Sequence, residues 1–166
     1  PRRQPGRTVT ATTMDDLGIA RALHVIAVVM WIGGVAFVTM VLLPSIRRRG
    51  GADGHALFEA LESPFARQAR VTTLIAGLTG LYMIWRLDIW DRFVEPAYWW
   101  MHGMVLIWLL FTMMLFVFEP WFLHAWFRRK AEAAPEATMA LIGRLHMVLI
   151  TLSLIVVFGA VAGAHS

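Results

Sequence analysis

Long uncharged runs alternate with short charged stretches along this 166-residue chain. No Asp, Glu, Lys or Arg occurs in Leu23–Leu43, in Ala97–Phe118 or in Leu145–His165. About twenty apolar residues form an α-helix long enough to cross the roughly 30 Å hydrocarbon layer of a bilayer. The pattern therefore predicts three membrane-spanning helices.

A fourth helix is predicted between the first two of these runs. Its apolar part, Val71–Trp85, has only 15 residues and lies between Arg70 and Arg86. Such a helix can span a bilayer if the two arginines extend their charged ends to the interface. Ser63 followed by Pro64 has the pattern of an N-cap with proline at the first helical position, which predicts the start of this helix.

The connections are expected to be short. Residues 50–54 contain three glycines and are predicted to form a turn, and residues 56–62 to form a separate amphipathic stretch at the interface. Pro120 is expected to kink the third helix before an aromatic extension. Asp15 and Asp16 are expected at the N-terminal end of the first helix.

Together these elements predict an all-α fold, an integral membrane four-helix bundle. Residues 1–14 are expected to form a flexible N-terminal arm and residues 15–166 a single four-helix domain. The expected spans cover about residues 17–43, 65–90, 97–127 and 137–165.

Composition supports a membrane environment. The chain is 58% hydrophobic and 16% charged, whereas soluble domains are about 45–50% apolar and about 25% charged. It contains no cysteine, which excludes disulfides, zinc-thiolate sites, iron–sulfur clusters and thiol catalysis. The net charge of +4 comes from arginines that flank the apolar runs, so the positive-inside rule explains it better than nucleic acid binding does.

The same arginines predict an orientation. Lys and Arg are concentrated in the first and third connections, while the second balances Arg86 and Arg92 with acidic residues. In a bacterial inner membrane both termini are then expected outside the cytoplasm. The arginines of the N-terminal arm favour the inverted orientation, which stays an alternative.

Histidines within the predicted spans are the main candidates for function, because polar groups in a bilayer are costly and tend to face the bundle interior. In an antiparallel bundle, His24, His102 and His165 are expected to share one layer. His124 and His146 are expected in the opposite layer. Each histidine taken alone is also consistent with a simple interhelical hydrogen bond.

Both layers contain enough imidazoles to hold haem b, which takes two axial ligands from facing helices. The hypothesis is therefore one or two haems, with one in each leaflet if there are two. Arg21 and Arg86 on the first side and Arg144 on the second are candidates to pair with haem propionates. The presence of arginines at the helix ends is explained equally well if their side chains extend to the membrane interface.

Copper is the main alternative cofactor. The chain has ten methionines, and methionine is a soft ligand for Cu(I). The segment Met101-His102-Gly103-Met104 brings both ligand types together, although adjacent residues on a helix point about 100° apart and Met101 and His102 would not easily chelate one ion. Methionine also fills apolar helices by default.

Two segments carry a family resemblance. The run from Leu23 to Gly34, closing with Pro44, resembles the first helix of the copper-resistance CopD-like membrane proteins and of the HemJ-type protoporphyrinogen oxidases. Trp100-Met101-His102-Gly103-Met104 is similar to the Trp-Leu-His-Ala-Lys pattern of HemJ-type proteins. This resemblance implies a four-helix haem b protein with His24 and His102 as matching histidines. Met104 stands where that pattern has a functional lysine, which argues against protoporphyrinogen oxidase activity.

The leading functional hypothesis is a b-type cytochrome-like membrane subunit that carries electrons through one or two haems. Its expected partners are the lipid bilayer and other membrane or redox subunits. One alternative is a copper transport or tolerance protein of CopD type, and another is a structural small subunit of a larger membrane complex. The short extramembrane segments favour an electron-transfer or accessory subunit over a stand-alone enzyme.

Overall fold

The computed structural model describes residues 8–123 and 135–163, and helices make up nearly all of them. The first helical rod consists of α1 (Thr8–Phe37), a π-helical segment η1 (Val38–Leu42) and α2 (Leu43–Arg49). It is followed by α3 (Gly51–Leu87) and two short 3₁₀ segments, η2 (Trp90–Val94) and η3 (Pro96–Tyr98). The remaining elements are α4 (Trp99–Met113), a π-helical segment η4 (Met114–Leu123) and α6 (Pro135–Gly163).

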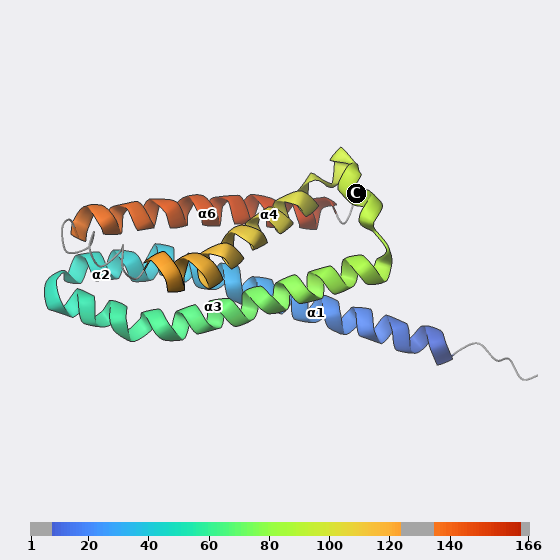
Figure 1. Cartoon of the computed structure of the whole chain (residues 1–166), viewed down its shortest axis with the longest axis horizontal. Helices are drawn as coiled ribbons and strands as arrows, with labels where there is room; N and C mark the ends of the chain where they lie inside the picture. Colours follow the sequence, from blue (N-terminus) through green and yellow to red (C-terminus); the bar gives the residue numbers. More distant parts are fainter. Residues whose placement is uncertain (1–7, 124–134, 164–166) are drawn as a thin grey trace, which may run out of the picture.

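These elements form an elongated bundle of four helical rods (Figure 1). α1 packs mainly on α3, and α6 packs mainly on α4. α3 turns back along α2, which also contacts α6, whereas α4 crosses the bundle obliquely between α6 and α3 (Figure 1). The predicted all-α, four-helix fold is confirmed.

Three helices in the described residues are long and apolar enough to cross a membrane: Asp16–Arg49, Pro96–Phe118 and Ala140–Gly163. They coincide with the three uncharged runs of the sequence. α3 is not among them, although with 37 residues it is the longest α-helix described. Its uncharged run, residues 71–85, is short and is bounded by Arg70 and Arg86.

The predicted start of α3 at Ser63 and Pro64 is wrong. α3 begins at Gly51 and continues through Pro64, so residues 56–62 are not a separate amphipathic stretch and the turn predicted at residues 50–54 is reduced to Gly50. Gly50 reverses the chain with φ 64°, a left-handed conformation that glycine adopts without steric cost. The first turns of α3 then lie on α2, where a Cβ on Gly54 would be 2.8 Å from the Ile46 carbonyl oxygen. Packing on α2 thus extends the helix past a proline that would otherwise be expected to start it.

The other helix ends also differ from the predictions. α1 begins at Thr8, so the second half of the predicted arm is helical, and Asp15 and Asp16 lie within the helix. The third helix widens into the π-helical segment at Met114, six residues before Pro120. A π-helix is a recognised cause of helix distortion, and here it begins ahead of the proline.

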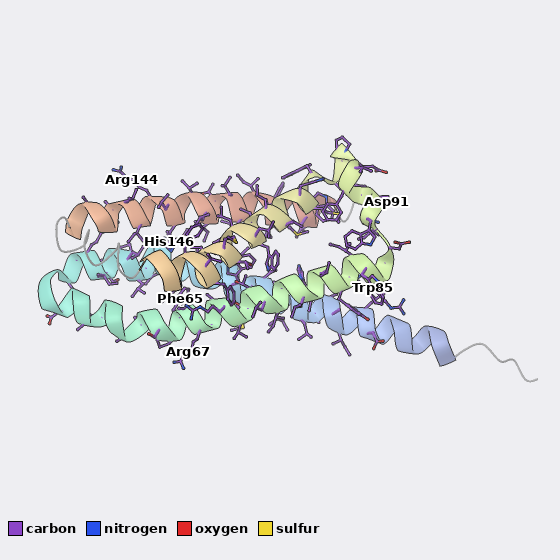
Figure 2. The ribbon with its side chains drawn as sticks, viewed as in Figure 1. Phe65, Arg67, Trp85, Asp91, Arg144 and His146 are labelled. Carbon is purple, nitrogen blue, oxygen red and sulfur yellow. The ribbon has the colours of Figure 1, made fainter. Side chains whose placement is uncertain are left out.

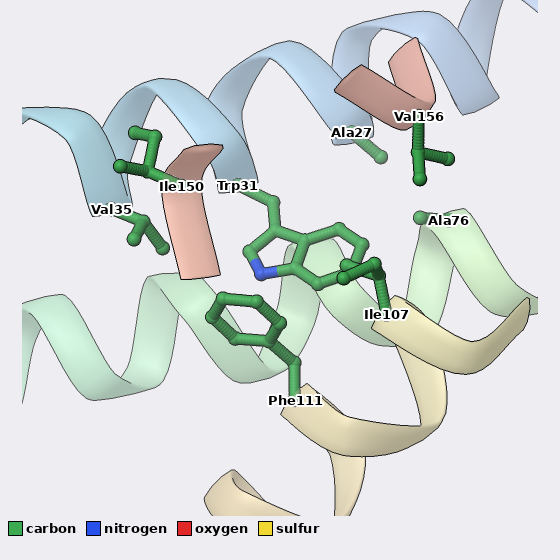
Figure 3. Packing of buried hydrophobic residues seen from close by; sticks show 8 residues of the cluster. All are labelled: Ala27, Trp31, Val35, Ala76, Ile107, Phe111, Ile150 and Val156. Carbon is green, nitrogen blue, oxygen red and sulfur yellow. The ribbon is translucent and has the colours of Figure 1, made fainter. Parts of the chain in front are cut away.

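The centre of the bundle is filled by side chains from all four rods (Figure 3). Trp31 of α1 is only 5% exposed, and its indole meets the ring of Phe111 edge to face with centroids 4.9 Å apart and planes at 90°. The remaining buried members of this cluster are Ala27, Val35, Ala76, Ile107, Ile150 and Val156. The middle of the bundle is therefore a packed apolar core.

Several glycines allow the helices to approach each other closely. A Cβ on Gly77 of α3 would collide with the indole of Trp108, and one on Gly159 of α6 would lie 2.6 Å from the ring of Trp99. Gly18 and Gly33 of α1 differ, because a Cβ at either position would have no neighbour within 4 Å. Similar close contacts are made by Gly34 with Phe65, Gly103 with Val156, and Gly163 with Trp100.

Candidate functional site

His24 lies on the face of α1 that packs against α3. Ala20 and Ala27, one turn before it and one turn after, are both buried. The His24 Nδ1 atom lies 2.9 Å from the Ala76 carbonyl oxygen and 3.1 Å from the Thr79 hydroxyl oxygen. His24 therefore joins the two most extensively packed helices by a polar contact.

This contact fixes the tautomer of His24. A carbonyl oxygen only accepts hydrogen bonds, so Nδ1 must carry the hydrogen and donate it to Ala76. In the neutral imidazole Nε2 then keeps its lone pair. Metal-ligating histidines use this arrangement, in which one ring nitrogen donates to a backbone carbonyl and the other binds the metal.

Gly80 makes room for the imidazole. A Cβ at this position would lie 3.2 Å from Cε1 of His24. The Thr79 hydroxyl lies 2.6 Å from the Ile75 carbonyl oxygen, to which it donates, and this bond leaves its oxygen to accept from His24. One turn of α3 thus positions the ring of His24.

His102 has a different partner. Its Nε2 lies 2.8 Å from the Phe93 carbonyl oxygen and donates to it, and its ring meets the Phe93 ring edge to face with centroids 5.4 Å apart. The His102 side chain is exposed. The hydrogen bonds of His24 and His102 therefore go to different elements, α3 for the first and the 3₁₀ segment η2 for the second.

His146 forms its hydrogen bond within its own helix. Its Nδ1 donates to the Ile142 carbonyl oxygen at 3.0 Å, and the half-buried side chain retains the Nε2 lone pair. Figure 2 shows His146 at the opposite end of the bundle from Trp85. His124 and His165 lie outside the described residues.

The three candidate arginines Arg21, Arg86 and Arg144 are all exposed. Arg144 points away from the bundle on the outer side of α6 (Figure 2). Within residues 8–123 and 135–163, no group of three or more His, Cys, Asp or Glu side chains is placed to hold a metal ion. Haem iron takes only one or two protein side chains, so this finding does not bear on a haem site.

Two polar contacts that the sequence did not predict join α3 to the α4 rod. The Arg70 Nε donates to the Leu115 carbonyl oxygen in the π-helical segment at 3.2 Å, and the Trp108 Nε1 donates to the Thr73 carbonyl oxygen at 2.9 Å. The first contact could have been suspected from the sequence, because Arg70 lies within a predicted span and a charged side chain there needs a polar partner. Backbone carbonyl acceptors have no signature in the sequence.

Some buried polar side-chain atoms in the described residues have no hydrogen-bond partner. They are Nε1 of Trp31, Oγ1 of Thr73, Nε1 of Trp100 and Oγ1 of Thr112. Such atoms are costly in an apolar interior. Polar groups of a bound molecule or of ordered water would stabilise them.

A groove opens between α1 and α3 one turn from His24. Its volume is about 330 Å³. Its walls include Ala20 and Leu23 of α1 and Thr79 of α3, and Asp16 and Tyr82 add polar groups. The accessible space next to the candidate ligand is thus largely apolar with a few polar groups.

Comparison of the chain with protein-family models, with curated proteins and with solved structures finds no match.

Proposed function

We propose that the chain is a membrane-embedded b-type cytochrome-like subunit that binds haem between its helices and carries electrons. All four helical rods cross the membrane, which in bacteria is the inner membrane, and both termini lie outside the cytoplasm. Three helices of sufficient length and hydropathy support the membrane location. The partners are the lipid bilayer and other redox subunits.

The observation that carries this proposal is the hydrogen bond of His24. An imidazole on a packed face of α1 donates Nδ1–H to the Ala76 carbonyl and retains a lone pair on Nε2. A histidine in this state can hold haem iron through Nε2. Bound haem would supply one-electron Fe(III)/Fe(II) chemistry, while the protein orients it and excludes water.

The packing of the bundle favours the ends over the middle as haem sites. Trp31 and Phe111 occupy the centre, so a haem held by His24 would lie toward the N-terminal end of α1. The second histidine that would hold this haem is His102 or His165. Use of Nε2 of His102 would require release of its bond to the Phe93 carbonyl.

The experiment is a dithionite-reduced absorption spectrum of the purified protein in detergent, combined with metal analysis. A sharp b-type α band is expected. It should disappear in His24→Ala and persist in the control His55→Ala, whose position in the first turns of α3 is at the opposite end of that helix from Thr79 and Gly80. Stoichiometric copper without an α band would favour a copper transport protein, and neither signal would favour a structural subunit. Either result would overturn the haem proposal.

A further inference from the structure

The segment that joins α3 to α4 exposes large apolar side chains. Trp90 of η2 and Trp99 at the start of α4 are each 50% exposed, and Val94 is 82% exposed. Among the large hydrophobic residues in the described part of the chain, Val94 is the most exposed. Exposed apolar patches of this kind mark a surface that contacts a membrane or another molecule.

The same segment lies across one end of the bundle. Figure 1 shows η2 and η3 running crosswise to the long helices, from the end of α3 to the start of α4. The candidate span Pro96–Phe118 begins inside the segment, and the candidate span Ala140–Gly163 ends close by, where Gly163 packs against the Trp100 indole. If these spans cross a bilayer, the segment runs along the membrane surface.

The backbone of the segment suits the boundary of the bilayer better than its hydrocarbon core. Its hydrogen bonds link residues three apart and are long, 3.3 Å from the Arg92 nitrogen to the Ile89 carbonyl oxygen and 3.4 Å from the Glu95 nitrogen to the Arg92 carbonyl oxygen. Irregular backbone exposed to lipid does not occur in the hydrocarbon region, because its polar groups would lack partners. Water and lipid head groups at the boundary provide such partners.

Aromatic and charged side chains of η2 lie on different sides. Residues three apart share one side of a 3₁₀ helix, and the ring centroids of Trp90 and Phe93 are accordingly only 6.4 Å apart. The three sides of η2 with its C-cap are one aromatic, one charged and one mixed: Trp90 with Phe93, Arg92 with Glu95, and Asp91 with Val94. The segment is therefore amphipathic.

A contact with α4 fastens the segment at its middle. His102 donates Nε2–H to the Phe93 carbonyl oxygen at 2.8 Å, and the two rings meet edge to face. The segment is thereby held at the end of the bundle while Trp90 and Val94 remain exposed.

We propose that residues 90–99 form an interfacial anchor, which lies in the head-group region of the bilayer. Trp90, Val94 and Trp99 contact lipid, and the exposed carboxylate of Glu95 faces water. Tryptophan favours this region because its ring is apolar while its N–H can bond to water or head groups. Lipid is the partner because the exposed surface continues directly into the apolar span Pro96–Phe118. The inference rests on the membrane location in the proposed function but not on haem.

The test uses the absence of cysteine from the chain. Single cysteines are introduced into the full chain, spin-labelled and reconstituted in phosphatidylcholine nanodiscs. Electron paramagnetic resonance then gives the ratio of the collision rate with oxygen, which concentrates in lipid, to that with a water-soluble nickel complex. Val94→Cys is the probe. The matched controls are Glu95→Cys on the charged side of the segment and Leu154→Cys at an exposed position in the middle of α6.

The ratio at Val94→Cys should be several times higher than at Glu95→Cys and lower than at Leu154→Cys. A ratio as low as that of free label in buffer would place the segment in water, and a label shielded from both reagents would show that a protein covers it. Either result overturns the anchor while leaving the membrane location intact. A low ratio at Leu154→Cys would overturn the membrane location itself and the anchor with it.

Discussion

The centre of the bundle and its His24 end are held together in different ways. At the centre, Trp31 and Phe111 pack edge to face within a cluster of apolar side chains from all four rods. At the His24 end, α1 and α3 are joined by an imidazole that donates to a backbone carbonyl. Packing and interhelical hydrogen bonds both stabilise helices in a bilayer. The centre is thus joined by apolar packing, while the end is joined by a hydrogen bond that leaves the Nε2 lone pair of His24 unused.

Trp31→Ala should have the largest effect on stability. Removing a large aromatic side chain from a packed core costs about 3 kcal/mol, because its contacts are lost and a cavity remains. The free energy of unfolding in mixed micelles, followed by far-UV circular dichroism, measures this loss. If haem binding at the His24 end does not depend on packing at the centre, the folded variant should still show the b-type α band. Loss of the band in a variant that keeps its helical content would show that haem binding does depend on the central packing.

Gly77→Leu should have the next largest effect. A side chain at this position would collide with the Trp108 indole, whose Nε1 donates to the Thr73 carbonyl. Overpacking of this kind costs about 2 kcal/mol. Gly33→Leu is the matched control, since a Cβ at Gly33 has no neighbour within 4 Å. The same micelle titration should show a loss in the first variant alone, and equal losses would mean that the close contact at Gly77 is unimportant.

The sequence predicted the helices far better than their ends. Three uncharged runs correspond to the three helices that are long and apolar enough to span a membrane, because hydropathy over about twenty residues is a strong signal. The start of α3 was predicted wrongly because Ser63 and Pro64 have the local pattern of a helix start. Packing of the preceding residues on α2, including the close contact of Gly54 with Ile46, outweighs that pattern.

The candidate site was predictable only in part. His24 was singled out because an ionisable residue within a span is costly and tends to face the interior, and the structure places it against α3. Its acceptor, the Ala76 carbonyl, could not be predicted, because every residue except proline carries the same backbone groups. For the same reason nothing in the sequence indicated that His102 would bond to the Phe93 carbonyl in a short 3₁₀ segment.

The smallest effects on stability are expected for His24→Ala and for His146→Ala, with which it is compared. The two variants remove, respectively, a hydrogen bond between helices and a hydrogen bond within one helix. Both histidines donate Nδ1–H to a backbone carbonyl, but His24 bonds to a second helix and His146 to Ile142 in its own helix. In haem-free protein, His24→Ala should cost about 1 kcal/mol, the typical net contribution of one hydrogen bond. His146→Ala should change the free energy of unfolding by less than about 0.5 kcal/mol, since alanine is the best helix former and the contact between helices is not involved. Equal losses in the two variants would mean that the bond from His24 to Ala76 does not hold α1 and α3 together, and the difference between centre and end would then be one of packing alone.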